Sequence, residues 1–208
     1  MYELIILALL ARWPLHGYLI AKITNDILGP YAHLSNGRLY PLLSKLEVAG
    51  LIALADDTPS TSGGRRLRRY AITDAGRRRV HHLLMDTTSN QGDYQRIFWY
   101  KLPCLDLLTL DERLYLLDHY ITYCQSHIFH YTAEITDLTT HHEHFEQSPA
   151  AYREAVMETL EHTLRRWRLE LEAALQWRTR IVAQAEHPPD APETETRAVA
   201  GGALTENS

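Results

Sequence analysis

The residues best suited to chemistry lie close together in residues 34–52, LSNGRLYPLLSKLEVAGLI. Leucines recur there at helical spacing, at positions 39, 42, 43 and 46, and predict one buried helix face. The opposite, polar face carries Asn36, Arg38, Tyr40, Ser44 and Lys45. These side chains match groups on DNA. The amide of Asn36 can form hydrogen bonds with adenine, and the guanidinium of Arg38 can form them with guanine or phosphate. The phenol of Tyr40 can contact phosphate or a thymine methyl group. We expect Lys45 to contact the DNA backbone, so the segment predicts a helix that reads base edges.

An arginine-rich hairpin follows in residues 63–73, GGRRLRRYAIT. Side chains of this length can reach phosphates or an adjacent minor groove from the tip of a hairpin. A solvated charged strand is the alternative, but the position directly after the leucine-backed helix favours phosphate contact. The candidate residues are Arg65, Arg66, Arg68 and Arg69.

Charge is divided unevenly along the chain, although the net value of −5 taken alone argues against a nucleic-acid partner. Residues 1–84 hold 11 Lys and Arg against 6 Asp and Glu, a net charge of +5. Residues 85–208 hold 10 Lys and Arg against 20 Asp and Glu, a net charge of −10. A basic first part joined to an acidic second part is expected when only one domain meets phosphate. Chance clustering is a weaker explanation, because six of the 11 basic residues lie between Arg65 and Arg78.

Length and cysteine content indicate the broad class of protein. A chain of 208 residues allows one or two domains and a core that folds without cross-links. Cys104 and Cys124 form no disulfide framework and match no zinc motif, so we expect a reducing, cytoplasmic setting. The apolar start, MYELIILALLARW, is too short to span a bilayer and predicts a core helix. No phosphate loop, nucleophile motif or paired carboxylates beside a glycine-rich turn predict an enzyme.

Apolar periodicity and turn formers predict the elements that position the candidate residues. Helices are expected over residues 2–12 and 18–28, from an N-cap at Ser35 to Gly50, and over 74–86. PLHGY is expected as a tight turn, and strands at 51–56 and 65–73 as a two-stranded hairpin. We expect the Ser35 hydroxyl to cap the third helix, Pro41 to bend it, and Thr73 or Asp74 to cap the fourth. This order predicts a winged helix-turn-helix, whose third helix fits the major groove.

The second half is predicted to form two long helices, over residues 109–143 and 149–184. Their apolar residues step by three and four, as along a coiled-coil seam, from Leu114 to Leu138 and from Leu160 to Ile181. Two rods of about 50 Å cannot bury both seams on a small domain, so we expect a homodimer, with a monomeric antiparallel hairpin as the alternative. The residues expected at the dimer contact are Leu117, Ile121, Ile128, Leu164, Trp167 and Leu171.

The expected fold class is mainly α with a small β-hairpin. A winged helix-turn-helix precedes a long-helix, coiled-coil-like dimerisation domain. The expected divisions are a DNA-binding domain at 1–86, a connector at 87–108, a helical dimerisation and effector domain at 109–186, and a tail at 187–208. The tail is expected to be disordered, because it has almost no large apolar residue.

Four motifs stand in order within about the first 80 residues. They are LHGY at 15–18, S-x-G-x-L-Y-P at 35–41, L-E-x-x-G-L-I at 46–52 and Y-x-I-T-x-x-G at 70–76. Together they resemble the PadR family of bacterial transcriptional regulators. The second half is similar, by length and helix pattern, to the PadR subfamily with a longer helical domain.

The resemblance implies a dimer with two winged domains on a near-palindromic operator in double-stranded DNA, usually acting as a repressor. It also implies DNA contacts by the serine, by the residues around L-Y-P, by the tyrosine of H-G-Y and by the basic wing. This wing is richer in arginine, and its loop longer, than the usual G-R-P-R-K form. The corresponding residues here are Tyr18, Ser35, Asn36, Arg38, Tyr40 and the four wing arginines.

Several members of that family release DNA when a small aromatic or hydrophobic compound binds, and one branch responds to phenolic acids. We hypothesise that a planar effector lies between the winged domain and the long helices and shifts the spacing of two recognition helices. Packing in the core or at a dimer contact is the alternative for aromatic residues at helical spacing. The candidates are Tyr94, Phe98, Trp99, Tyr123 and Trp167.

Histidines at 141, 142 and 144 raise the question of a metal site, because the side chains of His141 and His144 can share a helix face. They fall at a predicted helix end, where solvated histidines are ordinary, so neither a metal nor a cofactor is predicted. The predicted function is a homodimeric DNA-binding repressor that responds to an effector. The alternatives are a DNA-binding activator that recruits a partner protein, and a coiled-coil interaction module without specific DNA binding.

Overall fold

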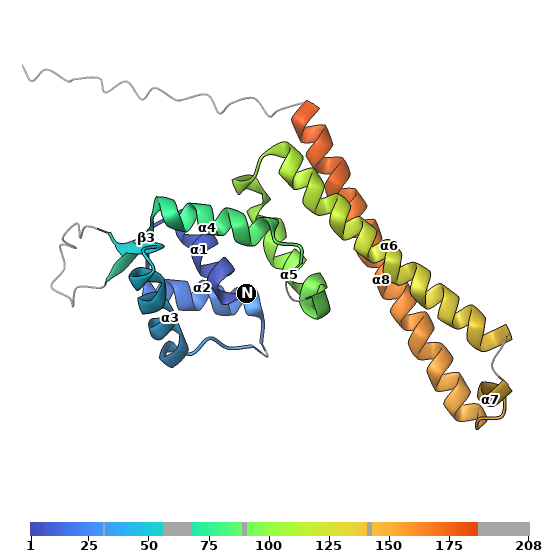
Figure 1. The fold of residues 1–208 in the computed structure, drawn as a ribbon. Coiled ribbons are helices and arrows are strands. Elements are labelled where there is room, and N and C mark those ends of the chain that lie inside the picture. The colour runs from blue at the N-terminus through green and yellow to red at the C-terminus, as the bar shows by residue number, and fades with distance from the viewer. Residues whose placement is uncertain (31, 56–67, 89–90, 141–142, 187–208) are drawn as a thin grey trace, which may run out of the picture.

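The computed structural model describes residues 1–30, 32–55, 68–88, 91–140 and 143–186. An N-terminal domain of helices and a small sheet is followed by a long helical hairpin that projects from it (Figure 1). The N-terminal helices are α1 (Tyr2–Leu10), α2 (Gly17–Leu28), α3 (Asn36–Val48) and α4 (Asp74–Met85). The strands are β1 (Leu15–His16), β2 (Ile52–Leu54) and β3 (Arg69–Ile72). The predicted fold class, a winged helix-turn-helix before long helices, is confirmed.

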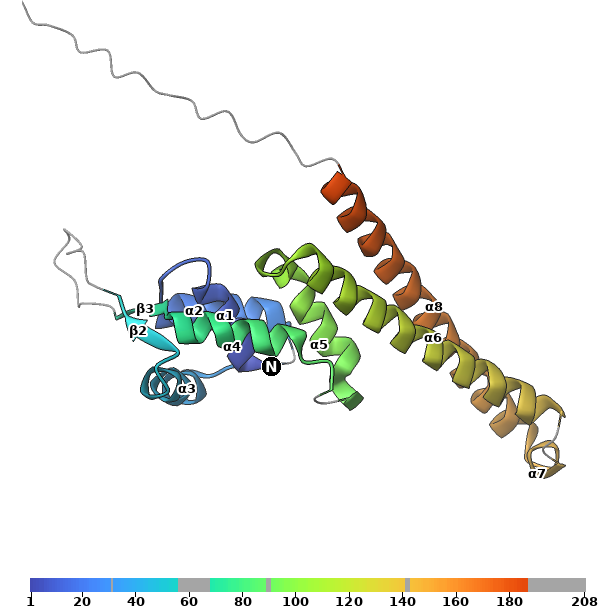
Figure 2. The same cartoon turned by 45° about the horizontal axis from the view of Figure 1, so that its top comes forward.

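The remaining elements connect this domain to the hairpin and form the hairpin itself. The connecting elements are η1 (Gln91–Asp93), α5 (Tyr94–Lys101) and η2 (Leu102–Leu107). The hairpin consists of α6 (Leu110–Thr140), α7 (Glu143–Glu146) and α8 (Ala150–Glu186). In both Figure 1 and Figure 2 the wing and α3 lie at the end of the molecule opposite the hairpin.

The N-terminal core is built around α1, which is apolar on most sides and whose Ile6 and Leu7 are fully buried. The predicted leucine stripe of α3 packs into the same core: Leu39, Leu43 and Leu46 are buried there. Burial of one leucine side chain contributes about 1.5–3 kcal/mol, so this stripe fixes which face of α3 is turned to solvent.

The sheet has three strands, not the predicted two. β3 lies in the middle and pairs antiparallel with both neighbours, and Leu15 of β1 lies opposite Tyr70 of β3. PLHGY, predicted as a tight turn, therefore supplies part of the sheet. Two residues are too few to show a strand's alternation, and their partner is distant in the sequence, so no local signal marks this strand.

Two of the glycine-containing motifs meet at the base of the wing. Thr73 is the N-cap of α4: its hydroxyl accepts a hydrogen bond from the Gly76 amide (3.1 Å) and donates one to the Gly50 carbonyl (2.6 Å). A Cβ on Gly76 would lie 2.0 Å from the Leu51 carbonyl oxygen. Gly50 has φ +69°, in the left-handed region that favours glycine. These contacts hold the wing against α4, and the predicted cap at Thr73 is confirmed.

The segment predicted as a connector is folded into short helices that pack on both sides. Phe98 of α5 stacks on Tyr120 of α6, with 3.7 Å between ring centroids. On the other side, the Arg12 guanidinium, just after α1, donates to the Pro103 carbonyl (2.9 Å) and to the Asp106 carboxylate (2.6 Å). α5 and η2 therefore join the N-terminal domain to the hairpin (Figure 1).

The two long helices pack antiparallel on each other, as Figure 1 and Figure 2 show. Leu117, Ile121 and Leu164, which the sequence predicts at a dimer contact, are buried within the single chain. The short connection through α7 brings two amphipathic helices together, so their seams meet in the same chain. Beyond Cys124, none of the described α6 residues is buried, and Ile128 is only half-buried.

Some predictions fall outside the described residues: those on Arg65 and Arg66, on His141 and His142, and on the tail at 187–208. Across the described parts of the chain, no helix combines the length and apolarity needed to cross a membrane. The same residues contain no group of three or more His, Cys, Asp or Glu placed to hold a metal ion. Cys104 and Cys124 are buried, free thiols, and burial raises the pKa of Cys124 to about 12.

Candidate nucleic-acid interface

The solvent face of α3 carries the residues predicted to read DNA. Asn36, Arg38, Tyr40, Ser44 and Lys45 are all exposed, whereas Leu39, Leu43 and Leu46 of the same helix are buried. α3 lies beside the wing and far from the hairpin (Figure 2). A helix with side chains is about 10–12 Å across and fits a major groove about 12 Å wide. The fold therefore brings the predicted residues together on one accessible surface.

Asn25 of α2 holds the start of α3 in place. Its Nδ2 donates to the Leu34 carbonyl (3.3 Å), and its Oδ1 accepts from the Leu34 amide (2.7 Å). Ser35 occupies the N-cap position, but its side chain makes no capping hydrogen bond, so the predicted hydroxyl cap is wrong. Asn25 and the burial of Leu34 fix the helix entry instead. Ser35 lines a groove between α2 and α3 together with Tyr18 and Asn36.

α3 continues through Pro41, which lies inside the helix. A proline there loses one backbone hydrogen bond and crowds the carbonyl four residues earlier. That earlier residue is Gly37, whose missing side chain leaves more room around the crowded turn. The polar start and the leucine-backed remainder thus belong to one continuous helix.

Tyr40 lies directly against Gly17, the first residue of α2. A Cβ on Gly17 would be 3.0 Å from Cε1 of the Tyr40 ring, closer than an ordinary van der Waals contact. The glycine of LHGY thus lets the tyrosine of L-Y-P lie over the backbone of α2. Tyr40 remains 50% exposed and Tyr18 is 71% exposed, so both phenols are accessible from solvent.

Arg38 has a weak partner within the protein. Its guanidinium lies over the Tyr2 ring, 5.5 Å from the ring centroid. Such a cation–π contact at an exposed site contributes about 0.5–1 kcal/mol. A bidentate contact with guanine contributes about 1–3 kcal/mol of base discrimination. Arg38 is therefore oriented by Tyr2 but can exchange that contact for a base.

The arginines in and after the wing have unequal roles. Arg68 is exposed. Arg69 is half-buried, and its Nη2 donates to the Pro14 carbonyl at 3.1 Å, which ties β3 to the segment before β1. On α4, Arg77 donates to the Ala11 carbonyl (3.1 Å) and Arg79 pairs with Glu3 (2.7 Å). Part of the basic cluster therefore stabilises the domain, and Arg68 is the described wing arginine most open to a phosphate.

The five predicted effector residues gather where α5, α6 and α8 meet. Tyr94 and Phe98 are each 2% exposed. Tyr123 makes edge contacts with Tyr94 (4.9 Å between centroids) and with Trp167 (5.5 Å), and Trp99 makes one with Phe98 (5.7 Å). These rings pack against one another, as the packing alternative expects.

A carboxylate that the sequence does not single out lies at the centre of this cluster. Glu170 of α8 accepts hydrogen bonds from Trp99 Nε1 (2.7 Å), Tyr120 Oη (2.7 Å) and Gln95 Nε2 (2.8 Å). Burial, together with the hydrogen bond to Glu170, raises the pKa of the Tyr120 phenol, so this hydroxyl stays protonated and donates. Glu170 is one of many acidic residues on α8, and no spacing signal distinguishes it.

A groove of about 610 Å³ adjoins the cluster, and its lining includes Tyr94, Tyr115, His119 and Tyr123. Tyr94 Oη and His119 Nδ1 form a hydrogen bond of 2.7 Å in its wall. Burial, and then the charge of nearby Lys101, lower the pKa of His119, so its imidazole is neutral at pH 7. Burial also lowers the pKa of Lys101 to about 8. The groove is an aromatic surface with hydrogen-bonding groups at its edge.

Comparison with known proteins shows that the N-terminal elements are similar to one protein family. Residues 6–82, from α1 to α4, match the family described as "Transcriptional regulator PadR-like family". No curated protein sequence matches the chain.

Solved structures of three bacterial proteins are similar to most of the chain. Bacillus subtilis PadR in complex with operator DNA is 19% identical, with 86% of this chain and 98% of that chain covered and a TM-score of 0.36. The PadR-like transcriptional regulator BC1756 from Bacillus cereus is 19% identical, with 88% and 99% covered and a TM-score of 0.35. The protein smu.1604c from Streptococcus mutans UA159 is 22% identical, with 84% and 96% covered and a TM-score of 0.36.

Proposed function

We propose that this chain is a DNA-binding transcriptional regulator of the PadR type, not an enzyme, and that it reads operator DNA with the solvent face of α3. The match of residues 6–82 to the PadR-like family supports this. Asn36, Arg38 and Tyr40 contact base edges in the major groove. Phosphate contacts hold the domain in register on the duplex. The residues that make them are Tyr18, Ser35, Lys45, Arg65, Arg66, Arg68 and Arg69.

The division of α3 into two faces is the observation that carries this proposal. Its buried leucines fix the rotation of the helix, and its polar residues remain exposed to solvent. The Asn25 clamp on Leu34 and the contact of Tyr40 with Gly17 fix the position of the helix along α2. A rigid, polar helix face without internal partners for Asn36 and Lys45 among the described contacts suits recognition of a groove.

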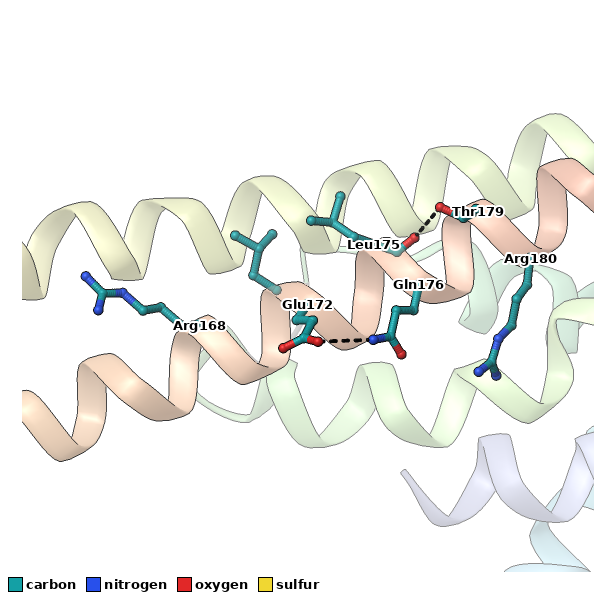
Figure 3. Close-up of a pocket in the computed structure, with 7 residues that line it drawn as sticks. Arg168, Glu172, Leu175, Gln176, Thr179 and Arg180 are labelled. Atoms are coloured by element: carbon teal, nitrogen blue, oxygen red, sulfur yellow. Dashed lines mark hydrogen bonds between the residues drawn. The ribbon is translucent and has the colours of Figure 1, made fainter.

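We propose in addition that the chain acts as a coiled-coil-like homodimer on a near-palindromic operator. The winged domains of the two copies would then bind the two half-sites symmetrically. A groove runs along the outer face of α8, and Figure 3 shows Arg168, Glu172, Gln176 and Arg180 along it. Leu175 of the same groove is exposed. Leucine between opposite charges suits contact with a second copy, because the same patch can pair with itself about a two-fold axis.

We propose that this protein represses transcription in the cytoplasm, and that binding of a small aromatic or hydrophobic effector makes it release the DNA. The groove beside Tyr94 and Tyr123 supports this, because it adjoins α5, the element between the winged domain and the hairpin. An effector can release DNA only if it binds the DNA-free arrangement more tightly. A screen of phenolic acids and planar drugs by thermal shift and operator release tests this mode. A screen in which no compound does both would count against it.

Footprinting of the DNA upstream of the chain's own gene tests the proposed function. We expect protection of two half-sites about 10–10.5 base pairs apart, or a multiple of that distance. Arg38→Ala and Tyr40→Ala should each weaken binding by about 5- to 100-fold, the equivalent of about 1–3 kcal/mol. Arg165→Ala and Tyr152→Ala, exposed positions on α8, are the matched controls. Protection that survives both α3 substitutions contradicts the proposal.

The same experiments separate the alternative functions. The acidic second half suits a DNA-binding activator that recruits a partner protein, or an interaction module without specific DNA binding. Specific protection of an inverted repeat excludes the interaction module. Transcript levels in a deletion strain separate the other two, because loss of a repressor raises the target transcript and loss of an activator lowers it.

A further inference from the structure

We propose that Glu170 is a positioning residue that fixes the winged domain on the long helices and so determines which half-site spacing the dimer accepts. This inference rests on the dimeric operator binding proposed above. Glu170 is a residue of α8, and the hairpin to which α8 belongs lies at the end of the molecule opposite α3 (Figure 1). It acts through α5, the element that lies between the two parts.

The first step is the attachment of α5 to the hairpin. Glu170 accepts from Gln95 and Trp99 of α5 and from Tyr120 of α6, at 2.7–2.8 Å. Hydrogen bonds to an ionised acceptor are about twice as strong as those between neutral groups. Because all three donors are neutral side chains, removing the carboxylate leaves three polar groups without this acceptor in an aromatic environment.

The second step is the attachment of α5 and η2 to the winged domain. The buried Lys101, the last residue of α5, donates to the Asp86 carbonyl at the end of α4 (2.5 Å). Arg12, just after α1, donates to the Pro103 carbonyl and the Asp106 carboxylate, both in η2. α5 is therefore held at its far end by the winged domain and along its side by Glu170, so it transmits the orientation of one to the other.

The third step is the distance between the joint at α5 and the DNA-reading helix α3. α3 lies at the opposite end of the molecule from α8 in both views (Figure 1 and Figure 2), so a small rotation of α5 on α8 displaces α3 by a larger distance. One turn of DNA separates half-sites by about 34–36 Å, and a shift of a few base pairs also rotates the second site around the duplex. A stiff joint therefore selects one spacing, and a loose joint accepts several.

The test measures binding to operators whose half-sites stand at the natural spacing or with about five inserted base pairs, half a turn. Wild-type protein should prefer the natural spacing by at least about tenfold, and Glu170→Leu should reduce this preference to about threefold or less, with unchanged affinity for a single half-site. Glu170→Gln should keep the preference, because its amide oxygen still accepts from Trp99 and Tyr120 while its nitrogen can donate to a rotated Gln95 amide. Glu154→Leu, at an exposed position near the other end of α8, is the control.

Each outcome has a separate meaning. A full spacing preference in Glu170→Leu overturns the positioning role, and so does an equal loss of affinity for single half-sites. If Glu170→Leu does not fold, Gln95→Leu removes one of the three hydrogen bonds and must show a smaller loss of spacing preference in the same direction. A wild-type protein that binds one half-site as tightly as a full operator overturns the proposed dimer, and the role of Glu170 with it.

Discussion

The leucine stripe of α3 and the heptad seam of α6 have similar apolar spacing but differ in how completely they are buried. Leu39 and Leu43 of α3 are fully buried, whereas Ile128 and Ile135 of α6 are half-buried. α3 packs into a domain formed by α1, α2 and the sheet, while the outer part of α6 packs along α8, away from that domain. Apolar spacing therefore predicts which face is turned inward, and the surrounding elements determine how much of it is covered.

This difference separates a domain that closes its own core from a hairpin that leaves apolar surface open. In the winged domain there is no room even for an added methyl group at Gly76. On the hairpin, Phe129 and Leu169 are exposed at 77% and 67%. Under the proposed function, the first property gives a rigid reading surface and the second provides the contact with another copy.

The largest expected effect is that of Gly76→Ala, which tests the tight packing of the winged domain. The new Cβ would lie 2.0 Å from the Leu51 carbonyl oxygen and 2.6 Å from Cγ1 of Ile72, so the base of the wing must move away from α4. We expect a loss of about 3 kcal/mol or more, measured by urea denaturation, or failure to fold. Gly92→Ala, where no atom lies within 4 Å, is the control, and similar losses in both would contradict this packing.

Truncation of one leucine in each region tests the comparison itself. Leu43→Ala in α3 should cost about 2–5 kcal/mol, because it leaves a cavity in a closed core. Leu138→Ala on the half-buried outer part of α6 should cost about 1 kcal/mol or less at low protein concentration, because solvent can occupy the space. The measurement is urea denaturation of both variants at the same concentrations. Equal losses would mean that the hairpin is as closed as the winged domain.

The sequence predicts the features that depend on local patterns, and it misses those that depend on contacts between distant segments. The leucine stripe at 39, 42, 43 and 46 and the cap at Thr73 are local patterns. Both are confirmed, except that Leu42 is only half-buried. β1 is missed because a two-residue strand is defined by its partner Tyr70 and not by its own sequence. The Ser35 cap is wrong because Asn25, on another helix, holds the helix entry in its place.

The candidate site divides in the same way between local and distant signals. The sequence pattern of α3 predicts that the polar residues Asn36, Arg38 and Tyr40 are exposed, and all three are. It cannot show that Gly17 makes room for Tyr40, since that contact depends on the packing of α2 against α3. Glu170 is missed for the same reason: its three donors come from α5 and α6, and no spacing on α8 indicates them.

A smaller effect is expected for Gly17→Ala, which tests whether the packing of the winged domain positions its reading surface. The added methyl group would lie 3.0 Å from the Tyr40 ring and should displace it. We expect operator affinity to fall by about three- to tenfold, with a stability change of about 1 kcal/mol or less. Gel-shift titrations of the single and double variants measure this. If Gly17→Ala weakens binding further in a Tyr40→Ala background, Gly17 does not act through Tyr40.

The smallest expected effect is a pH dependence that belongs to the hairpin side. Burial, and then the charge of Lys101 or of His130, lower the pKa values of His119 and His127. The unfolded chain therefore takes up protons first as the pH falls through about 6.5, so the stability these residues contribute is complete above that pH and is lost below it. The midpoint temperature of thermal unfolding should fall by a few degrees as the pH is lowered from about 7.5 to about 5.5. His127→Phe, which can keep the stack on Trp167, should flatten this slope, whereas His82→Phe on α4 should not.

The most direct test of the central claim, that α3 reads sequence, is a salt titration of binding to the operator and to a scrambled duplex with Arg38→Ala and Arg68→Ala. The account predicts that Arg38→Ala weakens operator binding by about 5- to 100-fold and scrambled binding much less. Arg68→Ala should weaken both about equally and reduce the log–log salt slope by about one. Equal binding of both duplexes by wild-type protein, or an equal loss on both duplexes in Arg38→Ala, would contradict sequence reading by α3.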